Sequence, residues 1–127
     1  MDLLLLLGRV LFGGFFLYNA FNHFTKANMM TAYTASKHVP SPKLAVYATG
    51  LLLFLGGTGV LLGISPEWAL LCLLVFLVPV TFIMHQFWRE TDPMQRMVQT
   101  IQFTKNVALI GAVLMMLSLS TPWPISF

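Results

Sequence analysis

The chain has 127 residues, of which 57% are hydrophobic and only 9% are charged. Soluble domains carry roughly a quarter charged residues, so seven basic and four acidic side chains are too few to cover a water-exposed surface. The small net charge of +3 is dispersed, which excludes a nucleic-acid-binding surface, and the single cysteine, Cys72, excludes a CxxC thiol–disulfide mechanism within the chain.

Four segments are long and apolar enough to cross a bilayer, which takes about 20 residues per helix. They are residues 3–24, 44–63, 68–86 and 98–119. We therefore expect an all-α fold, an integral membrane four-helix bundle, as a single transmembrane domain over residues 1–127. The first segment lacks the basic flank and cleavage site of a signal peptide, so we expect a retained helix.

The loops between these helices differ in length and charge. The first could hold a short surface helix over residues 27–38, because Met29, Met30 and Tyr33 fall on one side at helical spacing. The basic residues of the loops all lie in the first and third: Lys26, Lys37, Lys43, Arg89 and Arg96. The positive-inside rule then places both loops on the cytoplasmic side of the membrane and both termini on the opposite side, although Arg9 weakens the asymmetry.

Glycines recur in the second helix, where Gly50 and Gly57 are seven residues apart and Gly59 and Gly63 form a GxxxG pair. Small residues let helices approach closely in lipid. Packing within the bundle is the favoured interpretation, and a seam against another subunit is the alternative.

Polar residues inside a membrane are costly, so each needs a reason. On the first helix Asn19 and His23 share a face with Arg9, Phe12 and Phe16, and on the third helix Thr81, His85 and Arg89 form a line. Gln95, Gln99, Gln102 and Asn106 share a face of the fourth helix. Because helices one and three end where helix four begins, these groups should gather near the cytoplasmic interface. The candidate ligand-binding residues are Asn19, Asn22, His23, His85, Trp88, Gln102, Lys105 and Asn106.

Three interpretations of this cluster compete. One is a structural plug of amides and imidazoles, with Lys105 extending to the headgroups. Another is a pocket for an amphipathic ligand such as a quinone head, with aromatic walls from Phe82, Phe87, Trp88 and Phe103. The least favoured is a metal or haem held by His23 and His85, because no Cys or acidic cluster joins them. The residues alone leave the first two open, and no metal site is predicted.

Arg9 lies about two turns inside the opposite membrane face, where Glu67 is the nearest counter-ion, so an Arg9–Glu67 ion pair is predicted. A structural arginine is favoured there over a substrate or lipid-phosphate anchor. Trp68 and Trp123 have the character of interface anchors on that face.

At these residues the chain resembles the DoxX family of small bacterial membrane proteins. The resemblance rests on Gly8-Arg9, on residues 39–42 followed by Gly50 and Gly56-Gly57, on residues 85–88 with Asp92-Pro93, and on the block 102–111. Ala112 departs from it, where the family often has a second glycine. The resemblance implies a four-helix bundle linked to redox systems, such as quinone-coupled oxidation of sulfur compounds or oxidative-stress enzymes. It also implies a bacterial inner membrane, with the termini then on the periplasmic side.

Together these features predict a membrane subunit of a quinone-linked redox complex, inactive alone, that binds a quinone-like or lipid head group at the polar cluster. His23 and His85 would be hydrogen-bond or proton partners and Lys105 the fixed positive charge. The alternative is a non-catalytic accessory subunit of a larger respiratory or photosynthetic assembly. The expected partners are the lipid bilayer and other membrane subunits; no cofactor is certain, a quinone being the best fit and haem the weaker one.

Overall fold

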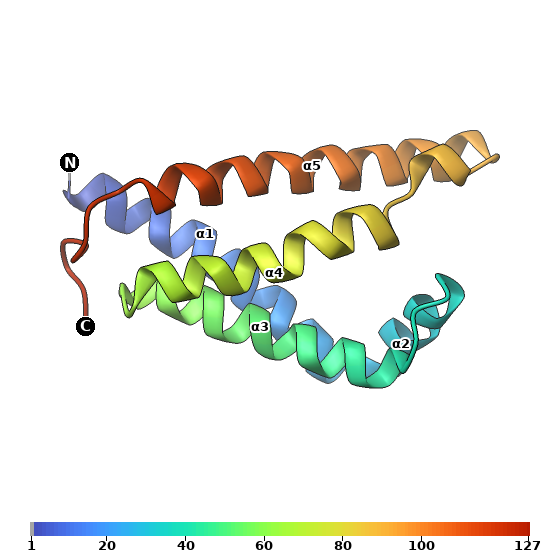
Figure 1. Cartoon of the computed structure of the whole chain (residues 1–127), viewed down its shortest axis with the longest axis horizontal. Coiled ribbons are helices and arrows are strands. Elements are labelled where there is room, and N and C mark those ends of the chain that lie inside the picture. The colour runs from blue at the N-terminus through green and yellow to red at the C-terminus, as the bar shows by residue number, and fades with distance from the viewer. Residues whose placement is uncertain (1) are drawn as a thin grey trace.

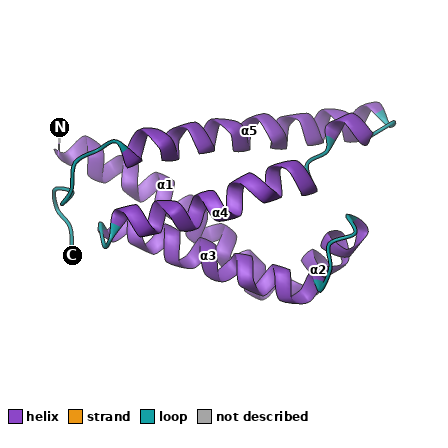
Figure 2. Cartoon of the chain, in the orientation of Figure 1, coloured by secondary structure: helices purple, strands orange, loops and turns teal. Residues whose placement is uncertain are grey.

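The computed structural model describes residues 2–127, and all of its regular structure is helical. Its elements are α1 (Asp2–Thr25), α2 (Ala27–Ser36), α3 (Pro42–Leu62), α4 (Pro66–Met84), a 3₁₀ turn η1 (Phe87–Arg89) and α5 (Pro93–Leu117), as Figures 1 and 2 show. Four of the segments are long and apolar enough to cross a membrane. The predicted all-α membrane bundle is confirmed, as is a short helix in the first loop.

The long helices pack in the order α1, α3, α4 and α5 (Figure 1). α1 lies along α3, α3 against α4, and α4 against α5, whereas α1 and α5 are not among the closely packed pairs. Both termini and the α3–α4 hairpin lie at one end of the molecule, and α2 and the α4–α5 connection lie at the other. The Lys37–Glu90 ion pair, 3.5 Å from Nζ to Oε1, joins these last two segments.

Glycine lets α1 and α3 approach each other closely. A Cβ atom added at Gly13 would lie 2.8 Å from the carbonyl oxygen of Gly57, and one at Gly57 would lie 3.0 Å from that of Gly13. Gly56 and Gly59 face α4 in the same way, against Leu73 and Ala69. The glycines of α3 therefore pack inside the bundle, as the favoured interpretation predicted.

The last helix begins at Pro93, five residues before the apolar span of residues 98–119; the sequence predicted this start from Thr91 or Asp92 as cap and Pro93 in the first turn. Asp92 is its N-cap, because its Oδ2 accepts a hydrogen bond of 2.9 Å from the backbone N–H of Gln95. Proline suits the first helical position, where its missing N–H costs nothing. The cap sets this boundary, and an average of hydropathy along the chain does not detect a cap.

Arg9 closes the end of the bundle that carries the termini. Its side chain is 1% exposed and donates to the carbonyls of Val60 and Leu61 on α3 and of Pro124 and Ile125 in the tail. The predicted Arg9–Glu67 ion pair is therefore wrong. Glu67 instead accepts from the Thr121 hydroxyl at 3.0 Å, and the carbonyls at the end of α3 offer Arg9 partial negative charge without a carboxylate.

The two tryptophans at this end behave differently. Trp68 is 73% exposed, as an interface anchor requires, but Trp123 is only 3% exposed and belongs to the core. The Arg9 guanidinium lies 5.8 Å from the centre of the Trp123 ring. Trp123 thus holds the tail against the bundle, and its predicted role as an interface anchor is wrong.

Candidate ligand-binding cavity

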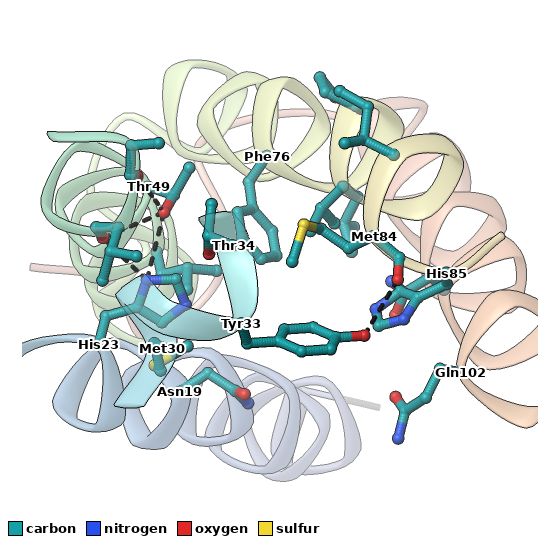
Figure 3. Close-up of a pocket in the computed structure, with 18 of the residues that line it drawn as sticks. Asn19, His23, Met30, Tyr33, Thr34, Thr49, Phe76, Met84, His85 and Gln102 are labelled. Atoms are coloured by element: carbon teal, nitrogen blue, oxygen red, sulfur yellow. Dashed lines mark hydrogen bonds between the residues drawn. The ribbon is translucent and has the colours of Figure 1, made fainter. Parts of the chain in front are cut away.

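A cavity of about 550 Å³ lies at the end of the bundle that carries α2 and the α4–α5 connection. All five α-helices contribute to its wall (Figure 3). Its size falls within the range of small-molecule sites. The cavity is partly open, and α1 and α5, which both line it, are not among the closely packed pairs.

The lining of the cavity divides into polar and apolar parts. The apolar part includes Phe16, Leu53, Phe76, Leu77 and Leu109. The polar part gathers hydroxyl, amide, imidazole and ammonium groups, and consists of Asn19, His23, Tyr33, Thr34, Thr49, His85, Gln99, Gln102, Lys105 and Asn106. A cavity of this kind suits a molecule with a polar head and a hydrocarbon part.

His23 forms one wall and is only 7% exposed. Its Nδ1 lies 2.9 Å from the carbonyl oxygen of Val46 and 3.2 Å from the hydroxyl of Thr49, both on α3. The ring edge of Phe76 packs against it from α4, with ring centres 5.9 Å apart. Three helices therefore hold the His23 imidazole in one orientation (Figure 3).

His85 forms the opposite wall and belongs to a chain of hydrogen bonds (Figure 3). Its Nδ1 lies 2.8 Å from Oε1 of Gln99, and Nε2 of Gln99 donates to the Tyr33 hydroxyl at 2.8 Å. That hydroxyl donates in turn to the carbonyl of Met84 at 3.2 Å. The chain links α2, α4 and α5 across the cavity.

This chain also explains where α4 ends. The sequence predicted a helix to Gln86 with Thr81, His85 and Arg89 in one line, but the helix ends at Met84. The Met84 carbonyl accepts from Tyr33, and His85 leaves the helix to meet Gln99. Arg89 lies in the separate turn η1 and is exposed, so the predicted line is wrong.

Lys105 lies on α5 and lines the cavity. Its Nζ donates to Oε1 of Gln102 at 2.8 Å and lies 5.5 Å from the centre of the Phe15 ring on α1. Cation–π contacts of this kind are worth about 0.5–1 kcal/mol at exposed sites. Lys105 thereby extends from α5 toward α1, and Gln102 is its one hydrogen-bond partner among residues 2–127.

Six of the predicted ligand-binding residues line the cavity: Asn19, His23, His85, Gln102, Lys105 and Asn106. Asn22 does not, and its backbone carbonyl accepts from the N–H of Lys26 at the turn into α2. Trp88 is exposed on η1 and packs edge-on against Phe87 and Phe103.

The aromatic wall is not the predicted one. Phe82, Phe87, Trp88 and Phe103 pack on one another outside the cavity, with ring centres 5.2–5.9 Å apart. The rings that line the cavity are Phe15, Phe16, Tyr33 and Phe76. Because α4 ends at Met84, the chain lines the cavity as far as His85, and Phe87 and Trp88 in the turn that follows lie outside it.

The sequence did not single out Tyr33 or Thr49 as site residues. Tyr33 reaches the cavity because α2 folds back over the end of the bundle (Figure 1), and Thr49 lies one turn from Val46 on the α3 face toward His23. The available signal for Tyr33 was its place on the apolar side of the short helix. That pattern fits a membrane surface equally well, so it could not reveal the contact with Gln99.

The charge in the cavity is simple. None of its lining residues is acidic, and Lys105 is the one residue there with a fixed charge. Within residues 2–127 no three His, Cys, Asp or Glu side chains are grouped closely enough to hold a metal. The cavity favours ligands whose oxygen atoms carry negative partial charge.

A family model described as DoxX matches residues 4–86 of the chain, which covers α1 to α4. The match ends at Gln86, so the block 102–111 lies outside it. No curated protein and no solved structure matches the chain.

Proposed function

Because the chain belongs to the DoxX family, we propose that it is a membrane subunit whose cavity binds the polar head group of a quinone-like lipid. The observation that carries this proposal is the meeting of two imidazoles, several amides and one ammonium group in a cavity whose remaining wall is aromatic and aliphatic. A quinone head is a flat ring with oxygen atoms at two ends. It requires hydrogen-bonding groups at its edges and apolar contact with its faces.

The route for the hydrocarbon tail supports the same proposal. Side chains of α1 and α5, among them Phe15 and Lys105, line the cavity, and these two helices are not a closely packed pair. A tail could leave between them into the bilayer while the head stays among the polar residues.

The proposal places the head group near the cytoplasmic face of a bacterial inner membrane, following the distribution of basic residues in the loops. It also makes the chain one part of a redox complex. The cavity supplies a binding site, and an electron donor or acceptor would come from another subunit.

Lys105 is the natural residue for a direct test. A charge-assisted hydrogen bond is worth about 1.5–3 kcal/mol, so Lys105→Met should weaken binding of a short-chain benzoquinone about 10- to 100-fold. Lys43→Met is the matched control, because Lys43 is exposed and lies outside the cavity. Titration calorimetry on protein in nanodiscs, with empty nanodiscs as blank, measures both affinities.

Binding no greater than in empty nanodiscs would overturn the proposal. A haem Soret band that co-purifies with the protein and is lost on His23→Ala would favour the haem alternative. α5 favours a second candidate, the accessory subunit, because only Gln99, Asn106 and Val113 are buried along it and the rest can face lipid or a partner. Isolation only within a larger assembly, without quinone in the cavity, would support that candidate.

A further inference from the structure

Backbone carbonyl groups determine that Nδ1 carries the proton in both cavity imidazoles, directly at His23 and through two side chains at His85. At His23 the partner of Nδ1 is the carbonyl oxygen of Val46, which can only accept. Nδ1 must therefore carry the proton. In the neutral imidazole this leaves Nε2 as an acceptor.

The same result follows at His85 through three linked groups. The Met84 carbonyl can only accept, so the Tyr33 hydroxyl donates its one proton to it. The hydroxyl oxygen then accepts from the amide N–H of Gln99, which turns Oε1 of Gln99 toward His85. His85 must donate to that oxygen from Nδ1, which again leaves Nε2 as an acceptor.

Neither Nε2 atom has a hydrogen-bond partner within residues 2–127, and both rings line the cavity. The lone pair of each Nε2 atom is therefore available to a hydrogen-bond donor of the ligand. Lys105 can donate to an oxygen in either oxidation state of a quinone. A carbonyl oxygen has no proton to donate, so a quinone cannot form a hydrogen bond with the Nε2 acceptor of either imidazole.

We infer that the cavity selects the reduced, dihydroxy form of the head group, a quinol, over the quinone. This inference rests on the proposed function and specifies the ligand of that same site. A quinol hydroxyl can donate to an Nε2 atom and its oxygen can still accept a hydrogen bond, so the imidazole acceptor is satisfied. A quinone would place a carbonyl lone pair against an imidazole lone pair, and an unsatisfied buried acceptor is unfavourable.

Such selectivity has a consequence for the reaction in which the subunit takes part. A tenfold preference for the quinol raises the reduction potential of the bound two-electron couple by about 30 mV. The site would then favour reduction of quinone delivered to the complex. The reaction class that fits is a substrate oxidation that delivers its electrons to quinone.

The test compares three ligands with one ring and one short tail: the benzoquinone, its hydroquinone, and the hydroquinone dimethyl ether, which lacks donors. Protein in nanodiscs is titrated under anaerobic conditions. We expect the hydroquinone to bind about tenfold more tightly than the quinone, and the dimethyl ether more weakly than the hydroquinone by a similar factor.

Two variants remove the acceptors while keeping the structural bonds. Asparagine places an amide N–H near the position of Nδ1 and has no atom at Nε2, so His23→Asn and His85→Asn retain donors to Val46 and Gln99. Each should lower the quinol-to-quinone affinity ratio toward one, because quinol loses an acceptor and quinone loses an unfavourable lone-pair contact. His38→Asn is the control, since His38 is exposed and lies outside the cavity.

Equal affinity for the two oxidation states, or tighter binding of the quinone, overturns this inference and leaves the proposed head-group site standing. Absence of binding by all three ligands overturns the proposed function itself. A ratio that stays unchanged in both histidine variants shows that the imidazoles do not discriminate, and it also overturns the inference.

Discussion

Arg9 is a buried cation whose partners are carbonyl oxygens. The last four carbonyl groups of any helix have no hydrogen-bond donor within the helix, and they carry partial negative charge. Arg9 satisfies those of Val60 and Leu61 and reaches two more in the tail. One side chain of α1 thereby fastens the end of α3 and the tail together.

Arg9→Lys should destabilise the protein although the charge is kept. The guanidinium fork donates in several directions at once, and a single ammonium group cannot reach four carbonyls spread over two segments. We expect a loss of about 2–4 kcal/mol in the free energy of unfolding, measured by reversible denaturant titration in mixed micelles. Arg89→Lys, at an exposed position, should change it by less than about 0.5 kcal/mol. Equal losses in both variants would contradict the role assigned to Arg9.

Tyr33→Phe should act on selectivity more than on stability. Without the hydroxyl, Gln99 is free to turn its N–H toward His85, and the proton on His85 can move to Nε2. The quinol-to-quinone affinity ratio should fall by about the factor expected of His85→Asn, with a stability change of about 1 kcal/mol or less. Tyr18→Phe is the control, because Tyr18 is 62% exposed and makes no hydrogen bond among the described residues. An unchanged ratio in the Tyr33 variant would refute the chain of hydrogen bonds as the source of selectivity.

At the level of helices, α3 is the element on which the others assemble. It contacts α1 through Gly57 and α4 through Gly56 and Gly59, and its carbonyls orient both Arg9 and His23. Gly63 ends it in the left-handed conformation, with φ of 72°, which glycine adopts without strain. A substitution on either face of α3 should therefore alter the packing at both ends of the bundle, around Arg9 and around His23.

Gly57→Leu should separate α1 from α3. Even a Cβ atom at this position would lie 3.0 Å from a backbone oxygen, and backbone cannot move aside as a flexible side chain can. We expect a loss of about 1–3 kcal/mol in unfolding free energy and weaker ligand binding, since His23 moves with α1. Gly111→Ala is the control, because nothing lies within 4 Å of its added Cβ. A variant as stable as the unmodified protein would show that α1 and α3 can separate without cost.

The whole molecule is closed at one end and open at the other. Arg9, Trp123 and the tail fill the end that carries the termini, whereas the partly open cavity lies toward the opposite end. Because each long helix crosses once, the two ends should face opposite sides of the membrane. The distribution of lysine and arginine predicts that the cavity end faces the cytoplasm.

Labelling of single cysteines tests this orientation. In a Cys72→Ala background, Ile64→Cys lies in the exposed α3–α4 hairpin and Thr91→Cys in the exposed α4–α5 connection. A membrane-impermeant maleimide should label the first variant in intact spheroplasts and the second only after lysis. The reverse pattern would place the cavity at the periplasmic face.

The composition and the spacing of residues determined that the chain lies in a membrane, that it forms four long helices, and that its polar residues converge at one end. These follow from the sequence because hydropathy and helix length depend on local residues and on which side each helix ends. The sequence also indicated His23, His85 and Lys105 as members of one cluster.

Only the tertiary structure decided how those residues meet. The end of α4 at Met84, the reach of Tyr33 to Gln99 and the pairing of Arg9 with carbonyls all depend on groups distant in the chain. Backbone carbonyls belong to every residue and leave no signature in the sequence. The partners that orient Arg9 and His23 are carbonyls of this kind, so only the folded chain reveals them.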